Sequence, residues 1–184
     1  MVIGLVAVAL FFLAFFGYLV GIYNALVRLK NDISKSWANI DVLLKQRADE
    51  LPKLIASVKG YMKHEKQTLE NLTLARTSFL SAKTMGEKAK ADSQISGILK
   101  SIFAVAENYP NLKASENFLE LQKRISAIEN ELADRREFYN ESVNNYNIKI
   151  HSFPDMLVAG MLQYRDEEMF KASEEDRKDV KVEF

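Results

Sequence analysis

The chain has 184 residues, with 25 basic and 25 acidic side chains, so its formal net charge is zero. General nucleic-acid-binding proteins hold phosphates with an excess of Lys and Arg, so we expect no nucleic-acid partner here. The sequence has no Cys, which excludes disulfides but does not identify the compartment.

The N-terminal segment differs from the rest of the chain because residues 1–27 carry no charged side chain, whereas charges are dense from Arg28 onward. At about 1.5 Å per helical residue, this run can cross a hydrocarbon layer about 30 Å thick. We therefore predict a transmembrane anchor over residues 1–27. A cleaved signal peptide would carry Lys or Arg before a shorter apolar run. A buried core helix fits poorly, because so small a domain cannot cover a helix that is apolar all round.

The charges that flank the anchor predict its orientation. Arg28, Lys30 and Lys35 follow the apolar run, and positive charges favour the cytoplasmic side. We expect a single-pass protein of the cell (inner) membrane with the remainder of the chain in the cytoplasm. The alternatives are a remainder on the outer side of the membrane, or a secreted domain released by cleavage near Ala25.

Small residues are aligned on one face of the anchor, at Gly17, Gly21 and Ala25. Such a face lets a second transmembrane helix approach closely, although similar patterns also arise by chance. We predict self-association through it, and hence a homo-oligomer.

The chain between residues 28 and 150 reads as four amphipathic helices, and no strand pattern competes. The first continues from the anchor through Pro52 with a kink, the second covers about 65–82, the third about 88–107 and the fourth begins after Ser115. Short connections favour antiparallel neighbours. The predicted fold is all-α: the transmembrane helix continues into an antiparallel up-and-down four-helix bundle with coiled-coil-like packing, followed by a short C-terminal amphipathic helix. The inward positions of the first and fourth helices are Ile33, Trp37, Ile40, Leu44, Ala48, Leu51, Ile55, Val58 and Met62, and Phe118, Leu121, Ile125, Ile128, Leu132, Tyr139, Val143, Tyr146 and Ile150.

A Tyr-Asn pair occurs three times, although Asn disfavours helix interiors. If the long fourth helix returns to the bilayer, pairs near both ends of the chain lie close to the water boundary, where Tyr is favoured. We predict that these pairs are membrane-proximal; the alternative is polar filler on a solvated face. The residues are Tyr23, Asn24, Tyr139, Asn140, Tyr146 and Asn147.

Residues 151–184 form a separate C-terminal region. Its apolar part is too short to span a bilayer but apolar enough to lie in the interface, and capping the base of the bundle is an equal alternative. Beyond Phe170 the sequence is charged, and we expect loose order there. The predicted interfacial segment comprises Phe153, Pro154, Met156, Leu157, Met161 and Leu162.

Catalytic motifs are absent from the sequence. His64 is followed by Glu65, but Thr68 stands where a zincin needs its second His, and no Glu-x-x-His pattern supports a di-iron bundle. Neither a nucleophile elbow nor a phosphate-binding glycine loop occurs. We therefore expect no enzyme activity, no catalytic or metal-binding residue and no cofactor.

Several segments resemble the LemA family of bacterial membrane proteins across nearly the whole chain. They are YNALVRLKNDI, the Trp37 to Arg47 pattern W-x-x-I-D-V-x-L-K-x-R, LPKLIASVKGYMKHE, ENYPNLKASENFLELQKRI, RREFYNESVNNYN and HSFPDMLVA. The resemblance implies one anchor helix and a helical bundle but no reaction. Genes of this family often lie near genes for membrane metalloproteases of the HtpX type, and one branch serves magnetosome membranes.

We interpret the protein as a membrane-anchored helical binding or scaffolding protein of the bacterial envelope, with an anchor (1–27), a LemA-like bundle (28–150) and a C-terminal region (151–184). Its expected partners are the lipid bilayer and other proteins, and the resemblance suggests an HtpX-type membrane protease that takes part in quality control. The alternative is an enzyme, or an enzyme accessory, with a cryptic site at the open end of the bundle.

Overall fold

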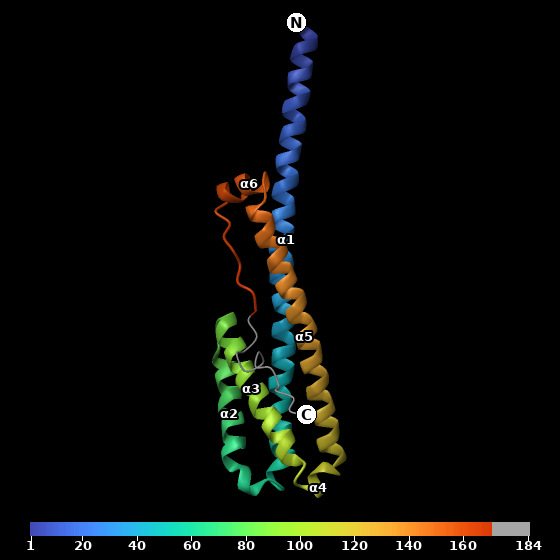
Figure 1. The fold of residues 1–184 in the computed structure, drawn as a ribbon, viewed down its shortest axis with the longest axis vertical. Helices are drawn as coiled ribbons and strands as arrows, with labels where there is room; N and C mark the ends of the chain where they lie inside the picture. The colour runs from blue at the N-terminus through green and yellow to red at the C-terminus, as the bar shows by residue number, and fades with distance from the viewer. Residues whose placement is uncertain (171–184) are drawn as a thin grey trace, which may run out of the picture. The chain divides into compact units, whose positions relative to one another are not determined.

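The computed structural model describes residues 1–170, and within this range every regular element is a helix (Figure 1). The all-α fold class is thereby confirmed for the described part of the chain. The charged tail predicted after Phe170 lies outside the described residues. The elements are α1 (Val2–Lys59), η1 (Lys63–Glu65), α2 (Lys66–Ser81), α3 (Met85–Ala106), α4 (Pro110–Lys113), α5 (Glu116–His151) and α6 (Asp155–Met161).

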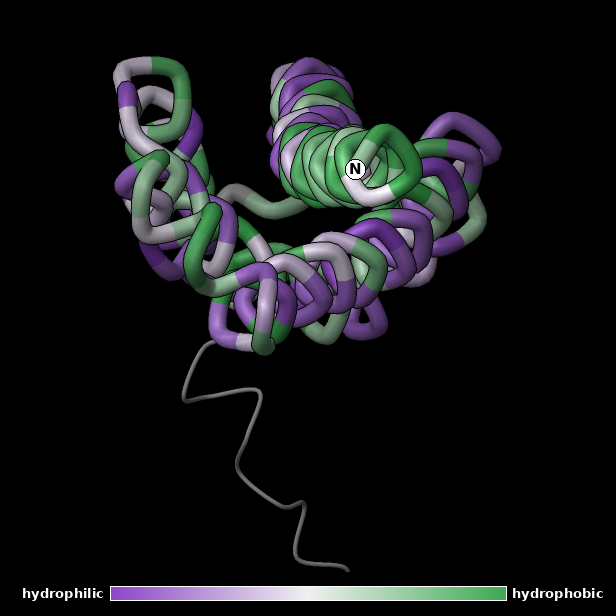
Figure 2. Tube along the Cα trace, turned by 90° about the horizontal axis from the view of Figure 1, so that it is seen from above, coloured by the Kyte–Doolittle hydropathy of each residue, from purple (hydrophilic) through white to green (hydrophobic). Residues whose placement is uncertain are grey.

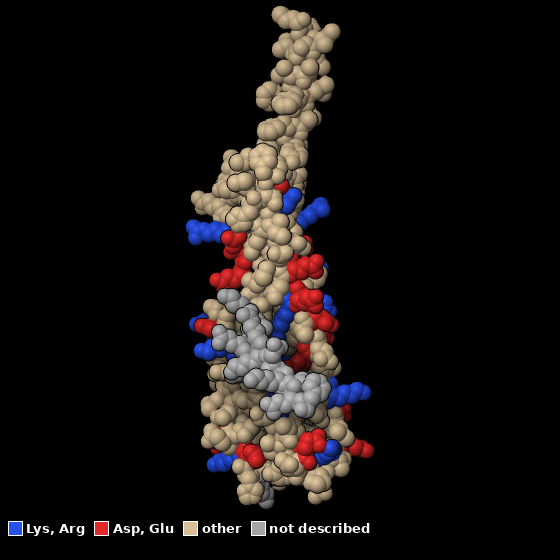
Figure 3. Space-filling view, in the orientation of Figure 1, with Lys and Arg blue, Asp and Glu red and all other residues tan. Residues whose placement is uncertain are grey.

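Helix α1 runs for 58 residues, about 87 Å at 1.5 Å per residue, and continues through Pro52. The expectation of one helix across this proline is confirmed, whereas a kink there stays a prediction. The N-terminal turns of α1 are green to near-white when viewed down the helix, which marks hydrophobic to neutral residues (Figure 2). In the space-filling view the same end of the chain carries no Lys, Arg, Asp or Glu (Figure 3).

The helix ends follow local capping chemistry. Thr84 caps α3 by accepting from the Glu87 N–H, while the Glu87 carboxylate accepts from the Thr84 N–H. This capping box starts α3 at Met85, earlier than the predicted residue 88. Pro110 occupies the first turn of the short helix α4, where its missing N–H costs no helical hydrogen bond.

The chain divides into two compact units, and α1 and α5 contribute a segment to each. The terminal unit comprises residues 1–39 and 135–169, and the central unit comprises residues 40–134 together with Phe170 in the described range. The predicted boundaries at residues 27 and 150 stay predictions, because compactness does not mark where lipid ends.

The central unit has an apolar core made by α1, α2, α3 and α5. Most of the inward positions predicted for α1 and α5 in this unit are buried, although Ile55 and Ile128 are only half-buried. The fully covered side chains include Ile40, Leu44, Leu51, Leu54, Leu72, Ile95, Leu99, Ile102, Ile125 and Leu132.

In the terminal unit, helix α6 ends in a Schellman motif. The Tyr164 N–H donates to the Ala159 carbonyl oxygen at 3.0 Å, and the Gln163 N–H donates to the Gly160 carbonyl oxygen at 3.1 Å. Gln163 has a φ of 55°, a left-handed conformation that is usually occupied by Gly. The turn leads into residues 164–169, which have no regular secondary structure and which we call the returning segment.

Candidate functional site

Two tyrosines and one asparagine of α5 contact the returning segment within the terminal unit. Asn147 contributes both halves of its side-chain amide: Nδ2 donates to the Glu167 carbonyl oxygen at 2.9 Å, and Oδ1 accepts from the Glu167 N–H at 2.9 Å. The Tyr139 hydroxyl donates to the Glu168 carbonyl oxygen at 3.1 Å. These bonds satisfy backbone groups that have no strand or helix partner. We call Tyr139, Tyr146 and Asn147 the α5 clamp.

Aromatic packing completes the α5 clamp. The Tyr146 ring lies 6.1 Å from the Tyr164 ring, between centroids, and Lys30 Nζ lies 4.8 Å from the centre of the Tyr164 ring. The Tyr139 ring packs edge-on against Trp37 with centroids 6.2 Å apart. The returning segment is therefore held both by its backbone and by a ring and cation contact.

The Tyr146 hydroxyl is buried and has no hydrogen-bond partner among residues 1–170. The two tyrosines of the α5 clamp therefore differ, since the Tyr139 hydroxyl forms the bond to Glu168.

Burial raises the pKa of both clamp tyrosines above the ordinary phenol range, and the Glu167 carboxylate raises them further. Since the folded protein holds these protons more tightly than the unfolded chain, the associated stability is complete below the unfolded pKa of about 10. It is lost as the pH rises from that value through the raised folded pKa.

The other predicted Tyr-Asn residues are placed differently. Tyr23 and Asn24 are exposed on α1 and, within the described residues, make no hydrogen bond, ion pair or ring contact. Asn140 is half-buried on α5. The structure thus brings Tyr139, Tyr146 and Asn147 together, and the membrane-proximal role of all three pairs stays a prediction.

The small-residue face of α1 is open. A Cβ atom built at Gly17 or Gly21 would meet nothing within 4 Å, and Ala25 is half-buried. Self-association through this face stays a prediction.

The predicted interfacial residues lie in α6 and directly beside it, and most of them are exposed. Phe153 is 79% exposed and Met161 is 86% exposed, while Asp155 and Ala159 are buried. Lys149 Nζ lies 3.0 Å from Asp155 Oδ1. Met156 and Leu157 are also exposed, whereas Pro154 and Leu162 are half-buried.

The central unit contains a buried ion network that our sequence analysis missed. Arg47 is 1% exposed, and its NH1 donates to Asp92 Oδ1 at 2.9 Å and to Ser96 Oγ at 2.8 Å. Its NH2 lies 3.2 Å from Glu129 Oε2. The guanidinium therefore links α1, α3 and α5. The sequence contains a signal for it, since Arg47 lies at core spacing from Leu44 and Leu51. The apolar residues around it, however, predict only an apolar helix face.

A second ion cluster surrounds Glu50, one turn after Arg47 on α1. Glu50, which is 7% exposed, accepts from Arg124 at 2.7 Å and from Lys53 at 3.2 Å.

A separate pocket of about 390 Å³ has an apolar lining that includes Met62 and Leu69. Among the described residues no group of His, Asp or Glu is arranged to hold a metal ion.

Together, residues 1–170 define the class: an all-helical protein with a long apolar N-terminal helix that is a candidate membrane span by length and composition. The model of the LemA family matches residues 36–184, and the chain belongs to this family. The resemblance inferred from the sequence motifs is thereby confirmed.

Three relatives show how far the likeness extends. The chain is 33% identical over 181 residues to Protein LemA of Metamycoplasma hominis, covering 92% of this chain and 82% of that protein. It is 23% identical over 184 residues to Magnetosome proteins MamQ 1 and MamQ 2 of Paramagnetospirillum magneticum, covering 86% of this chain and 68% of each relative. None of these names specifies a reaction.

Proposed function

We propose that the protein is a single-pass inner-membrane protein whose cytoplasmic helical body binds or scaffolds other proteins. One observation carries the membrane assignment: the apolar window of α1 has none of its residues buried, with a mean hydropathy of 2.6. Leaving so many large apolar side chains in water would be costly, because burying each one is worth about 1.5–3 kcal/mol. A bilayer is the environment that removes this cost.

The arrangement proposed for the helical body is an antiparallel up-and-down bundle. The ion network of Arg47 joins α1, α3 and α5, and Arg76 Nε of α2 donates to the Ala48 carbonyl oxygen of α1 at 2.9 Å. Helices α2 and α3 also pack against each other. Short connections between successive helices favour antiparallel neighbours in such a set.

The proposed binding surface is the exposed charged face of α5. Glu120, Lys123, Glu137 and Glu141 are all exposed on this helix. Mixed charges on a rigid helix give a partner specific electrostatic contacts with little conformational cost. An HtpX-type membrane protease, suggested by the family resemblance, is the first candidate partner.

Alkaline carbonate extraction tests the anchoring. We expect the full-length protein to stay in the membrane pellet, with the mass of the uncleaved chain. A C-terminal fluorescent reporter should be active and a C-terminal alkaline phosphatase inactive, because the body is cytoplasmic. Recovery of the full-length chain in the soluble fraction would refute the anchor, and the opposite reporter pattern would refute the orientation.

Site-specific photocrosslinking tests the binding role. A photoreactive residue at Glu120 or Glu137 should capture discrete protein partners in intact membranes. The matched control is Leu74 of α2, which is 64% exposed in the same chain. Identical products from both helices would contradict a binding surface on α5, and absence of an HtpX-type protease among specific products would remove that candidate.

A further inference from the structure

Helix α6, together with Phe153 just before it, exposes large apolar side chains and buries Asp155 and Ala159, whereas an ordinary surface helix buries its apolar face. Phe153, Met156, Leu157 and Met161 are 79%, 48%, 58% and 86% exposed. On the opposite side, Asp155 is 5% exposed and lies next to Lys149. Exposed apolar side chains gathered on one face mark an interaction surface.

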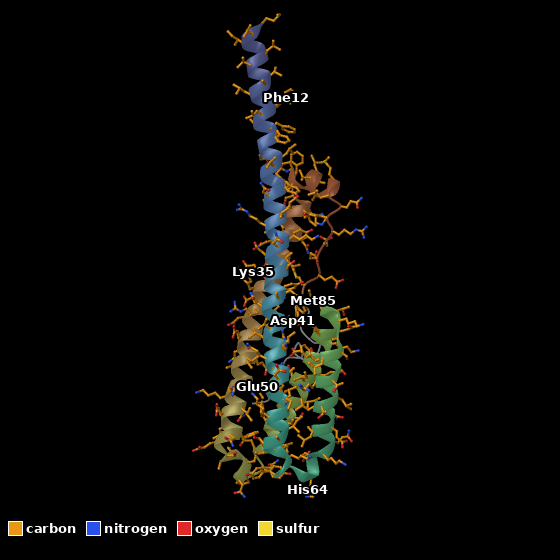
Figure 4. The ribbon with its side chains drawn as sticks, turned by 180° about the vertical axis from the view of Figure 1, so that it is seen from behind. Phe12, Lys35, Asp41, Glu50, His64 and Met85 are labelled. Carbon is orange, nitrogen blue, oxygen red and sulfur yellow. The ribbon has the colours of Figure 1, made fainter. Side chains whose placement is uncertain are left out.

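The position of this face along α1 indicates what covers it. Seen along α1, α6 lies between the levels of Phe12 and Lys35, both labelled in Figure 4. Exposed large apolar side chains are dense along α1 as far as Val20, and the first buried residue is Ile22. Within the terminal unit, the apolar face of α6 therefore occurs at the end of the segment proposed to cross the bilayer.

The chemistry beside α6 is that of a membrane interface. Tyr164 follows the helix, and Lys30 Nζ lies over its ring. Aromatic rings and Lys or Arg side chains are characteristic of the headgroup level. Because Arg165 is followed by Asp166, Glu167 and Glu168, the local charge gives no strong preference for anionic lipid.

We propose that α6 lies in the bilayer interface, with its outward face at the boundary between headgroups and acyl chains of the membrane that α1 crosses. The inference rests on the proposed anchoring by α1. Apolar burial supplies the attraction, so zwitterionic lipid is sufficient. The ion pair between Lys149 and Asp155 lies on the side that faces the protein.

Depth measurements by spin labelling test this placement, and the absence of Cys makes single labels direct. The full chain is labelled through Phe12→Cys, Leu157→Cys, Met161→Cys or Glu120→Cys and reconstituted in phosphatidylcholine vesicles. We expect relaxation by oxygen to dominate at Phe12, an intermediate balance at Leu157 and Met161, and relaxation by a water-soluble nickel chelate at the exposed Glu120. The same depths are expected when phosphatidylglycerol is included.

The depths of the labels at Phe12, Leu157 and Met161 test the anchor and the position of α6 separately. Water-like labels at Leu157 and Met161 with a lipid-like label at Phe12 overturn the inference and leave the anchor intact. A water-like label at Phe12 overturns the proposed function. Labels on α6 that neither reagent reaches would show that protein covers the face, which overturns the inference. Dipolar broadening that vanishes on dilution with unlabelled chain would identify that covering protein as a second copy. Insertion only with phosphatidylglycerol also overturns the inference, because charge would then be the attraction.

A matched pair of variants provides a second readout. Leu157→Glu combined with Met161→Glu should shift a label introduced by Phe153→Cys toward water without changing the helical content. Leu74→Glu, at an exposed position of α2, should leave that label in place. An unchanged depth in the double variant would contradict the inference.

Discussion

The helices of the central unit and the returning segment of the terminal unit are held by polar side chains of different kinds. The central unit encloses a full charge, with Arg47 1% exposed and joined to Asp92, whose side chain is 3% exposed. In the terminal unit the buried Asp155 carboxylate pairs with Lys149, but the returning segment is held by neutral groups, the Tyr139 hydroxyl and the Asn147 amide, which bond to its backbone. Removing a partner of a buried charge costs far more than removing a neutral hydrogen bond. The same kind of substitution should therefore have global consequences in one unit and local consequences in the other.

The largest effect is expected at Arg47. The variant Arg47→Met removes the cation that bonds to the buried Asp92 carboxylate, which should cost about 3–5 kcal/mol of unfolding free energy. Urea unfolding of the reconstituted protein, followed by circular dichroism, measures the loss. The double variant Arg47→Met with Asp92→Leu should recover much of it. A loss below about 1 kcal/mol in the single variant would contradict the contrast between the units.

A smaller effect is expected at Asn147. The variant Asn147→Ala removes both hydrogen bonds to Glu167, each worth about 1 kcal/mol. The returning segment should open locally, so amide exchange at Glu167 should accelerate while α2 and α3 keep their protection. Asn145→Ala, at an exposed position of the same helix, is the matched control. Equal acceleration in both variants would show that the Asn147 amide does not hold the segment.

Next in size is Tyr139→Phe, which removes the bond from its hydroxyl to the Glu168 carbonyl oxygen. We expect a loss of about 1 kcal/mol in the free energy of opening the segment, again measured by amide exchange. Tyr23→Phe provides the comparison, because that exposed hydroxyl has no partner among the described residues. It should change stability by less than about 0.5 kcal/mol.

The smallest effect at neutral pH is expected for Tyr146→Phe. Its hydroxyl has no partner among residues 1–170, so its removal should be neutral or slightly stabilising. Above pH about 10 the wild-type protein should lose stability, because the buried phenols have raised pKa values and the unfolded chain releases its protons first. Thermal unfolding across this range should show a shallower decline in the variant. A parallel decline would assign the loss to other groups.

Much of the helical organisation was predictable because it depends on spacing along one element. The stripe from Ile33 to Val58 keeps its phase through Pro52, and α1 is one helix as that phase requires. The predicted start of α3 was less accurate. The hydrogen bond from the Thr84 N–H to the Glu87 carboxylate determines where the helix begins, and the spacing of apolar residues does not reveal this bond.

The candidate site was only partly predictable. The inward placement of Tyr139 and Tyr146 followed from their spacing, and both are buried. Their partner did not follow, because residues 164–169 have no periodic pattern and are positioned by the turn at Gln163. The Arg47 network was missed for a related reason: pairing across helices decides whether a charged residue at core spacing is buried.

Helix α5 binds residues 167 and 168 through their main chain, and this mode of binding affects how the sequence can diverge. Asn147 and Tyr139 bond only main-chain atoms there, so these contacts place no demand on the side chains at either position. Substitutions could accumulate freely along the acidic stretch while the helix retains its tyrosine and its amide. Distant homologues should then be easier to detect through the spacing of Tyr139 and Asn147 than through the sequence of the returning segment that these residues bind.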